Sequence, residues 1–208
     1  MSRLRQLCRE GNLAEVRAAL TRGEDVNDMD LDGSTALMLA VEKKHNPIVK
    51  PLLDQPAVDV NVKDKWGRTL LHIAAKNNNA EGARMLLLRK DICANVTNFF
   101  GNTALIIAIE NKYNPIVKLL LVQPAVDVNK KNKFAGQTAL HRAAYENNAE
   151  GARMLLLHKD FNSVNVTDNH GNTALMIAVY YRSEETLREL VKHQCVSLDV
   201  GHLERNQR

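Results

Sequence analysis

The sequence predicts an all-α solenoid in which antiparallel helix pairs stack and short β-hairpin-like fingers join one pair to the next. One observation is a repeat: an apolar segment with Gly first and Thr third returns at intervals of 34 or 35 residues. Its copies are GSTALMLA (33–40), GRTLLHIA (67–74), GNTALIIA (101–108), GQTALHRA (136–143) and GNTALMIA (171–178). The other observation is that a second helix signal follows each copy. A period of this size is typical of units that bury apolar surface against their neighbours.

Every unit has the same order of elements. The Thr can cap a helix N-terminus, so it predicts the start of a short apolar first helix. An Asn or Ser then predicts the start of a second helix, in two copies with a proline at the first helical position. These starts are Asn46-Pro47, Asn79-Ala80, Asn114-Pro115, Asn148-Ala149 and Ser183. Stretches such as AVDVNVKDKWG (57–67) then predict an extended approach to a turn.

The spacing predicts six units in a single domain that spans 1–208. They are a partial N-terminal unit (about 2–30), four full units (31–64, 65–98, 99–133 and 134–168) and a terminal unit (169–200), followed by a tail (201–208). We expect the first and last units to act as caps, because a stack of repeats needs a polar outer face at each end.

These units resemble ankyrin repeats, in which a hairpin finger precedes two antiparallel helices and a Thr-Pro-Leu-His stretch opens the first helix. The segments Thr69–His72 and Thr138–His141 match that stretch best, although its proline is absent, and Asp59–Asn61 and Asp127–Asn129 match the segment after the second helix. The histidine stands only in alternate units. We interpret His72 and His141 as structural residues that bond backbone near the hairpin.

Composition excludes several classes of function. The 208 residues are 45% hydrophobic and 25% charged, no run is long and apolar enough to span a membrane, and the start lacks a secretory signal, so we expect a cytoplasmic protein, with the nucleus also compatible. Cys8, Cys93 and Cys195 are too few and too scattered for a disulfide framework or a zinc site, and His193 and His202 add no ligand spacing. No catalytic motif appears, so we expect no enzyme, no cofactor and no metal.

The protein carries an internal comparison, because a two-repeat block is duplicated. NPIVKPLLDQPAVDVN (46–61) returns as NPIVKLLLVQPAVDVN (114–129), and NNNAEGARMLLLRKD (77–91) returns as ENNAEGARMLLLHKD (146–160). In the family that the repeats resemble, partners usually bind a concave face made of the fingertips and the exposed ends of the first helices. At those positions nine of ten pairs differ between the copies, whereas 11 of 51 other aligned positions differ. Neutral surface drift and reshaping for a ligand both account for that difference.

Aromatic residues favour reshaping for a ligand. The chain has nine, and seven of them fall on the predicted concave face, where large rings are typical anchors of protein interfaces. The alternative is that several of these rings pack between neighbouring fingers and stiffen the fingers. Of the adjacent pair, we expect Phe99 to pack between fingers and Phe100 to face the groove of the concave face. The predicted partner-binding residues are Trp66, Arg68, Lys76, Phe99, Phe100, Phe134, Tyr145, Tyr180 and Tyr181.

We therefore expect a monomeric, noncatalytic scaffold that binds a protein or peptide. A nucleic-acid-associated protein is a weaker alternative, which rests on the pI near 9.0 and the basic finger NKKNKF (129–134). A self-associating structural solenoid is a further alternative. Proteins of the family that the repeats resemble are often substrates of asparaginyl hydroxylases. These enzymes favour an Asn that follows Asp-Val and has a Leu eight positions earlier, and Asn61 and Asn129 fit that pattern.

Overall fold

A computed structural model, which describes residues 2–193, is all-α, as the sequence predicts. Among the described residues, β pairing is limited to two isolated antiparallel bridges, Met29 with Thr35 and Thr167 with Thr173. The helices are α1 (Arg3–Glu10), α2 (Leu13–Thr21), α3 (Ala36–Glu42), α4 (Asn46–Leu53), α5 (Leu70–Lys76), α6 (Ala80–Leu87), α7 (Ala104–Glu110), α8 (Asn114–Leu121), α9 (Ala139–Glu146), α10 (Ala149–Leu156) and α11 (Ala174–Tyr180), and residues 184–193 are also helical.

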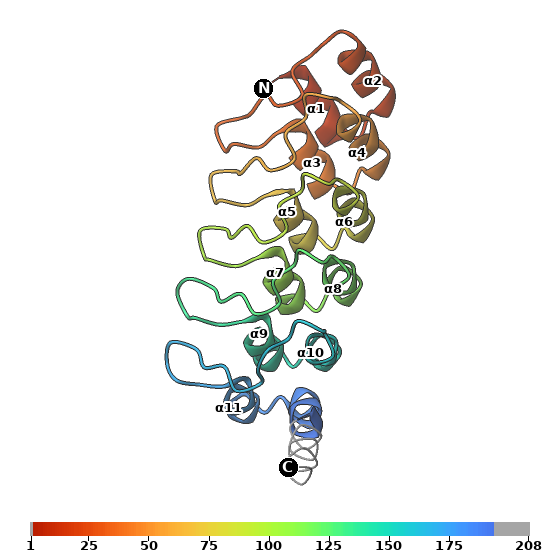
Figure 1. The fold of residues 1–208 in the computed structure, drawn as a ribbon. Helices are drawn as coiled ribbons and strands as arrows, with labels where there is room; N and C mark the ends of the chain where they lie inside the picture. Colours follow the sequence, from red (N-terminus) through yellow and green to blue (C-terminus); the bar gives the residue numbers. More distant parts are fainter. Residues whose placement is uncertain (1, 194–208) are drawn as a thin grey trace. The chain divides into compact units, whose positions relative to one another are not determined.

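The chain divides into two compact units, Met1–Ile107 and Ala108–Arg208. In the first unit, α1, α3 and α5 pack side by side in one layer, and α2, α4 and α6 form a second layer behind them (Figure 1). In the second unit, α9 packs against α11 and α8 against α10. In both units the fingers project from the layer of first helices (Figure 1). The expectation of a single domain over 1–208 stays a prediction, and residues 194–208 of the predicted terminal repeat and tail lie outside the described residues.

Short apolar helices form the core of each unit. In the first unit the fully buried side chains include Leu37, Ile48, Leu52 and Leu86, which come from both layers. Burying a side chain of this size stabilises the fold by about 1.5–3 kcal/mol. Because helices α1 to α11 have only seven to nine residues each, they depend on this packing rather than on their own helix propensity.

The helix starts follow the predicted caps, with one correction. The side chain of Thr35 accepts a hydrogen bond from the Met38 amide at 3.2 Å, and that of Asn79 accepts one from the Gly82 amide at 2.8 Å. This correction concerns both copies with a proline: Asn46 and Asn114, predicted as caps, are instead the first residues of α4 and α8, and the capping positions belong to His45 and Tyr113. The reason is that proline fits either of the first two positions of a helix, where its missing amide donor has no partner to lose.

His72 and His141 are structural, as predicted. The Nδ1 atom of His72 accepts a hydrogen bond from the Thr69 amide at 3.1 Å, and its Nε2 atom donates to the carbonyl of Asn102 in the next finger at 2.9 Å. His141 repeats this arrangement with Thr138 and Asn172. Burial lowers the pKa of both imidazoles, which keeps each ring in the neutral form that can accept at one nitrogen and donate at the other.

Candidate functional site

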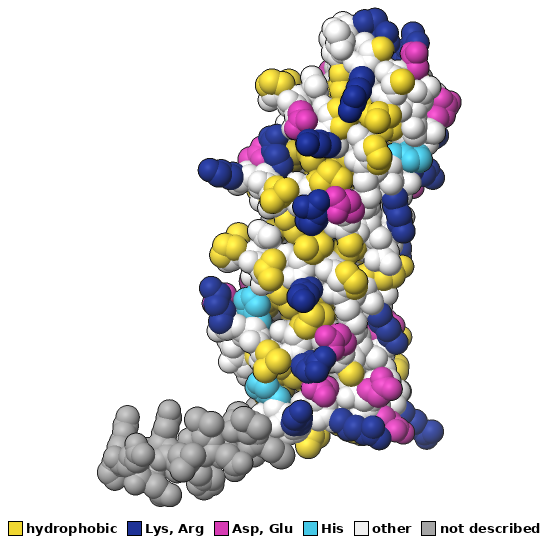
Figure 2. Space-filling model, turned by 90° about the vertical axis from the view of Figure 1, so that its right-hand side faces the viewer, with side chains coloured by type: hydrophobic (Ala, Val, Ile, Leu, Met, Phe, Trp, Pro, Cys, Tyr) yellow, Lys and Arg dark blue, Asp and Glu magenta, His cyan; other side chains and the backbone are white. Residues whose placement is uncertain are grey.

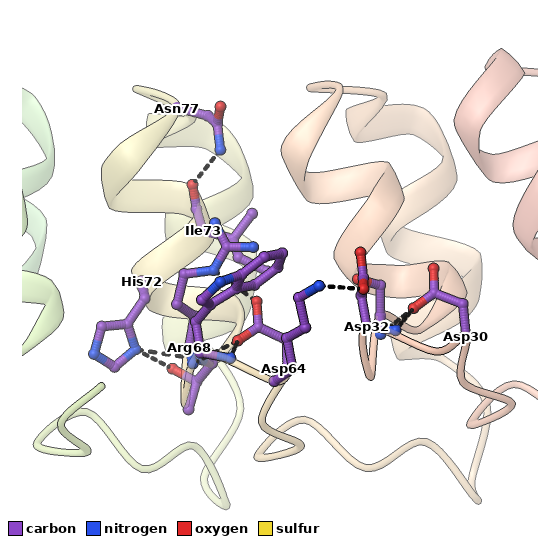
Figure 3. A network of polar contacts seen from close by, with 11 residues as sticks. Asp30, Asp32, Asp64, Arg68, His72, Ile73 and Asn77 are labelled. Carbon is purple, nitrogen blue, oxygen red and sulfur yellow. Dashed lines mark hydrogen bonds and ion pairs between the residues drawn. The ribbon is translucent and has the colours of Figure 1, made fainter. Parts of the chain in front are cut away.

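Each fingertip is shaped by one buried or half-buried Asp or Asn side chain. In the finger before α5, the Oδ1 atom of Asp64 accepts hydrogen bonds from the amides of Trp66 at 3.0 Å and Arg68 at 2.8 Å (Figure 3). Asp30, Asn98, Asn132 and Asp168 bond the amides of their own fingers in the same way. This turn chemistry directs the side chain two residues later outward. Sequence reasoning missed these residues, although an Asp or Asn three residues before most of the anchor glycines was the available signal.

Neighbouring fingers are joined by backbone hydrogen bonds. In the first unit the Lys65 amide donates to the Asp32 carbonyl at 2.8 Å, and the Phe99 amide donates to the Trp66 carbonyl at 3.0 Å. Gly67, at φ +73°, makes the second contact possible, because a Cβ atom there would lie 2.8 Å from the Phe99 ring. The fingers therefore have a fixed spacing, and their exposed side chains are presented by a rigid backbone.

Trp66 lies among charged side chains on this surface. We call Lys65, Trp66 and Arg68 the Trp66 cluster. The Lys65 ammonium and the Arg68 guanidinium each lie 4.5 Å from the centroid of the indole ring, within cation–π range. Lys65 Nζ donates to Asp32 Oδ1 at 2.6 Å, and Arg68 Nε donates to Asp64 Oδ2 at 2.6 Å (Figure 3). The indole remains 39% exposed.

The other predicted residues of the first unit are also exposed. Phe99 and Phe100 are 65% and 62% exposed, so neither belongs to the core. The Phe99 ring lies against the finger that contains Gly67, which agrees with its expected position between fingers. The Phe100 amide donates to Asn98 Oδ1 at 3.0 Å, which fixes its backbone at the fingertip. Lys76 is exposed in the last turn of α5.

The second unit has a cluster of three tyrosines. The ring centroids of Tyr145 and Tyr181 are 4.4 Å apart, and those of Tyr180 and Tyr181 are 4.9 Å apart. The Arg142 guanidinium lies 4.8 Å from the centroid of the Tyr145 ring. Arg142 also forms ion pairs with Glu110 at 3.0 Å and Glu146 at 3.1 Å, so two carboxylates neutralise it. Sequence reasoning missed Arg142, whose counterpart in the duplicated block is Ile73.

An open pocket adjoins the tyrosine cluster. Its volume is about 690 Å³, and it is lined by Asn172, Leu175, Met176, Ile177, Val179, Tyr180 and Tyr181. Met176 and Val179 are exposed although they lie on a first helix, whereas the equivalent side chains of α3 and α5 are buried by the next repeat. Phe134 lies on the finger before α9, where its ring is exposed and the Lys133 ammonium is 6.0 Å from its centroid.

The proposed hydroxylation sites hold neighbouring repeats together. Asn61 Nδ2 donates to the Asp91 carbonyl at 2.7 Å, and Asn61 Oδ1 accepts from the Cys93 amide at 2.8 Å. Asn129 makes the same pair of bonds with the Asp160 carbonyl and the Asn162 amide. Both side chains therefore have a structural role, and their hydroxylation stays a prediction.

Other features bear on the remaining alternatives. Lys131 of the basic finger donates to the Thr167 carbonyl at 2.7 Å, so one of its three lysines bonds the next finger. Within residues 2–193, no group of three His, Cys, Asp or Glu side chains could hold a metal ion, and no helix is long and apolar enough to cross a membrane. Burial raises the pKa of the Cys8 thiol to about 12, whereas Cys93 is exposed. Cys195 and His202 lie outside the described residues.

Comparisons with known proteins agree with this architecture. The sequence matches the family described as "Ankyrin repeats (3 copies)" over residues 4–98, 46–132 and 105–201. The crystal structure of EF0377, an ankyrin repeat protein, is 26% identical, with 90% of this chain and 96% of that chain covered and a TM-score of 0.82. An ankyrin repeat domain from Acinetobacter baumannii AYE is 26% identical over 92% of this chain and 97% of that chain, with a TM-score of 0.80.

A third structure shows likeness of fold alone. The ankyrin repeat domain of Bcl-3, a member of the IkappaB protein family, is 24% identical, with 93% of this chain and 86% of that chain covered and a TM-score of 0.82. The search of curated proteins found no match.

Proposed function

The chain belongs to the ankyrin repeat family, whose fold generally serves protein–protein interaction, and from this premise we propose that it is a noncatalytic scaffold that binds a protein or peptide partner. The binding surface is the predicted concave face, formed by the fingertips and the ends of the first helices. We place the protein in the cytoplasm, or in the nucleus, as a monomer. The fold hosts many functions, so the proposal depends on this surface rather than on the family alone.

The observation that carries the proposal is the exposure of the aromatic side chains on this face. All seven are between 39% and 80% exposed, although the chain has only nine aromatic residues. Large aromatic side chains bury much area on binding and lose few rotamers, and a central anchor of this kind contributes about 2 kcal/mol or more. Removing one such anchor would weaken binding about thirtyfold.

The test compares two triple variants of the full chain as baits for partners from a lysate of the source organism. The first changes Trp66, Phe100 and Tyr181 to alanine. The matched control changes Leu88, Val122 and Leu157, which are 74%, 66% and 75% exposed, to alanine. These three residues directly follow second helices. Figure 2 shows the side of the molecule that the second helices form, rather than the side of the fingers.

The aromatic variant should lose partners that the wild type and the control both retain. Retention of every partner by the aromatic variant would exclude the proposal. Loss of the same partners by the control alone would move the binding surface to the second helices.

Self-association is a second candidate function, favoured by the exposed apolar pocket beside α11. Light scattering that rises with protein concentration in the wild type, and not in a Met176→Ser, Val179→Ser variant, would support it.

A further inference from the structure

We infer that the Trp66 cluster binds an acidic peptide segment that contains an aromatic residue. The inference rests on the proposed function and deepens it, because it assigns a chemistry to the partner. The partner's carboxylates pair with Arg68 and Lys65, and its ring packs on the exposed part of the Trp66 indole.

Asp64 leaves part of the Arg68 guanidinium available. Asp64 is buried, and its hydrogen bonds come from within the finger: Oδ1 accepts from the Trp66 and Arg68 amides, and Oδ2 accepts from Arg68 Nε. The contact with Arg68 is therefore through Nε, while the Arg68 side chain remains 30% exposed. The two terminal nitrogens of a guanidinium form a planar fork that matches a carboxylate.

Lys65 can exchange its present partner for one on a ligand. Its ion pair with Asp32 lies on the surface, with both side chains nearly half exposed. Surface ion pairs of this kind contribute little to stability. A partner carboxylate can therefore compete with Asp32 for the Lys65 ammonium.

The cation–π contacts determine the sign of the partner's charge. Two cations, each paired with one carboxylate, already lie 4.5 Å from the centroid of the Trp66 ring, so a lysine or arginine brought to this ring would have to compete with them for its π face. An acidic partner meets complementary charge at the same place. Because Asp64 holds Arg68 through Nε and keeps this contact in the proposed complex, the Arg68 side chain loses little freedom when the partner binds.

The duplicated block shows that this chemistry is confined to one finger. At the positions of Lys65, Trp66 and Arg68, the copy in the second unit has Phe134, Ala135 and Gln137. That finger has lysines at other positions, with Lys133 6.0 Å from the centroid of the Phe134 ring, but it has neither the indole nor cations at the positions of Lys65 and Arg68. The nearby Arg142 does not replace them, because two carboxylates pair with it, those of Glu110 and Glu146, whereas Arg68 and Lys65 pair with one each.

Intrinsic fluorescence tests the inference, because Trp66 is the only tryptophan in the chain. The full-length protein is titrated, at low salt, with an acetylated and amidated pentapeptide that has phenylalanine between two pairs of glutamates. Comparison peptides carry lysine or glutamine in place of the four glutamates. The acidic peptide should shift the Trp66 emission saturably, with a Kd at least about tenfold lower than that of either comparison peptide.

Two variants locate the charges. Arg68→Gln, which introduces the residue of the duplicated finger, should weaken binding of the acidic peptide at least about fivefold. Lys65→Gln, a purely surface change, should weaken it less but measurably. The matched control is Arg84→Gln, which removes the same charge from α6 in the same unit and should leave the Kd unchanged.

Equal binding of the lysine or glutamine peptide, or an equal loss in Arg84→Gln, would overturn the inference. The absence of a saturable shift with the acidic peptide would also overturn it. The proposed function would survive these results if the variant at Trp66, Phe100 and Tyr181 still lost partners that the wild type retains.

Discussion

Replacement of His72 by alanine tests how the finger that follows α5 is held to that helix. The imidazole is buried and makes hydrogen bonds with the Thr69 amide and the Asn102 carbonyl. Its loss leaves the buried Thr69 amide without this acceptor, which costs about 1–3 kcal/mol. The Asn102 carbonyl still accepts from the Asn98 amide at 3.0 Å, so it adds no comparable penalty. The cavity adds about 1–2 kcal/mol, and we expect a total loss of about 2–5 kcal/mol.

Urea unfolding at pH 7, followed by circular dichroism, measures this loss of unfolding free energy. His141→Ala should give a similar loss, because His141 makes the same pair of bonds in the second unit. His170→Ala is the control, since His170 is exposed on a fingertip and its replacement should change stability by less than about 0.5 kcal/mol. If His72→Ala were no less stable than His170→Ala, the imidazole bonds could not be what holds the finger.

The same histidine predicts a pH dependence. Burial lowers the pKa of His72 in the folded state, so the unfolded chain takes up a proton first as the pH falls. The stability that the neutral ring provides is complete above the unfolded pKa of about 6.5 and declines as the pH falls from there toward the lowered folded pKa. Between pH 7 and pH 5, wild-type stability should fall more steeply than that of a His72→Met variant, which carries the residue found at the same position in α3.

Three further changes test other features of the repeats. Pro51→Leu should raise the unfolding free energy by about 1–3 kcal/mol in the same urea assay, because proline inside α4 removes a backbone hydrogen bond. The copy in α8 carries leucine at this position, and no increase would contradict this account of α4. Lys112 has a φ of +57°, a left-handed conformation that costs asparagine about 0.5–1 kcal/mol less than lysine. Lys112→Asn should therefore raise the melting temperature slightly, and a lower melting temperature would contradict this account. Asn61→Ala should lower the unfolding free energy by about 1–3 kcal/mol, because the Asp91 carbonyl and the Cys93 amide lose their partner, and an unchanged value would show that these bonds do not stabilise the stack.

Features set by local spacing could be predicted from the sequence. The order of the helices, the caps at Thr35 and Asn79 and the role of His72 follow from residues within one turn of each other, and the structure agrees with them. The predicted caps of α4 and α8 are wrong by one residue, because the position of a proline does not distinguish the first helical residue from the second.

Pairings between repeats could not be predicted in the same way. Lys65 meets Asp32, and Arg142 meets Glu110, across more than 30 residues of sequence. Such contacts depend on which rotamers the neighbouring finger or helix leaves open, and no local pattern determines that. The seven aromatic residues are exposed, and their role as a binding face stays a prediction, whereas the two cations over the Trp66 ring became evident only from the folded fingers.

The tip of the finger before α9, from Asn132 to Gly136, has one residue more than the tips of its neighbours, and this has a consequence for engineering. Asn132 Oδ1 reaches the amides of Ala135 and Gln137, three and five residues on, whereas Asp64 reaches amides two and four residues on. The Ala135 carbonyl nevertheless accepts from the Asn169 amide at 2.9 Å, like its counterparts in the other fingers. The extra residue is absorbed at the tip without shifting the next repeat. Residues 133–135 are therefore a natural position for grafting short recognition loops into this scaffold.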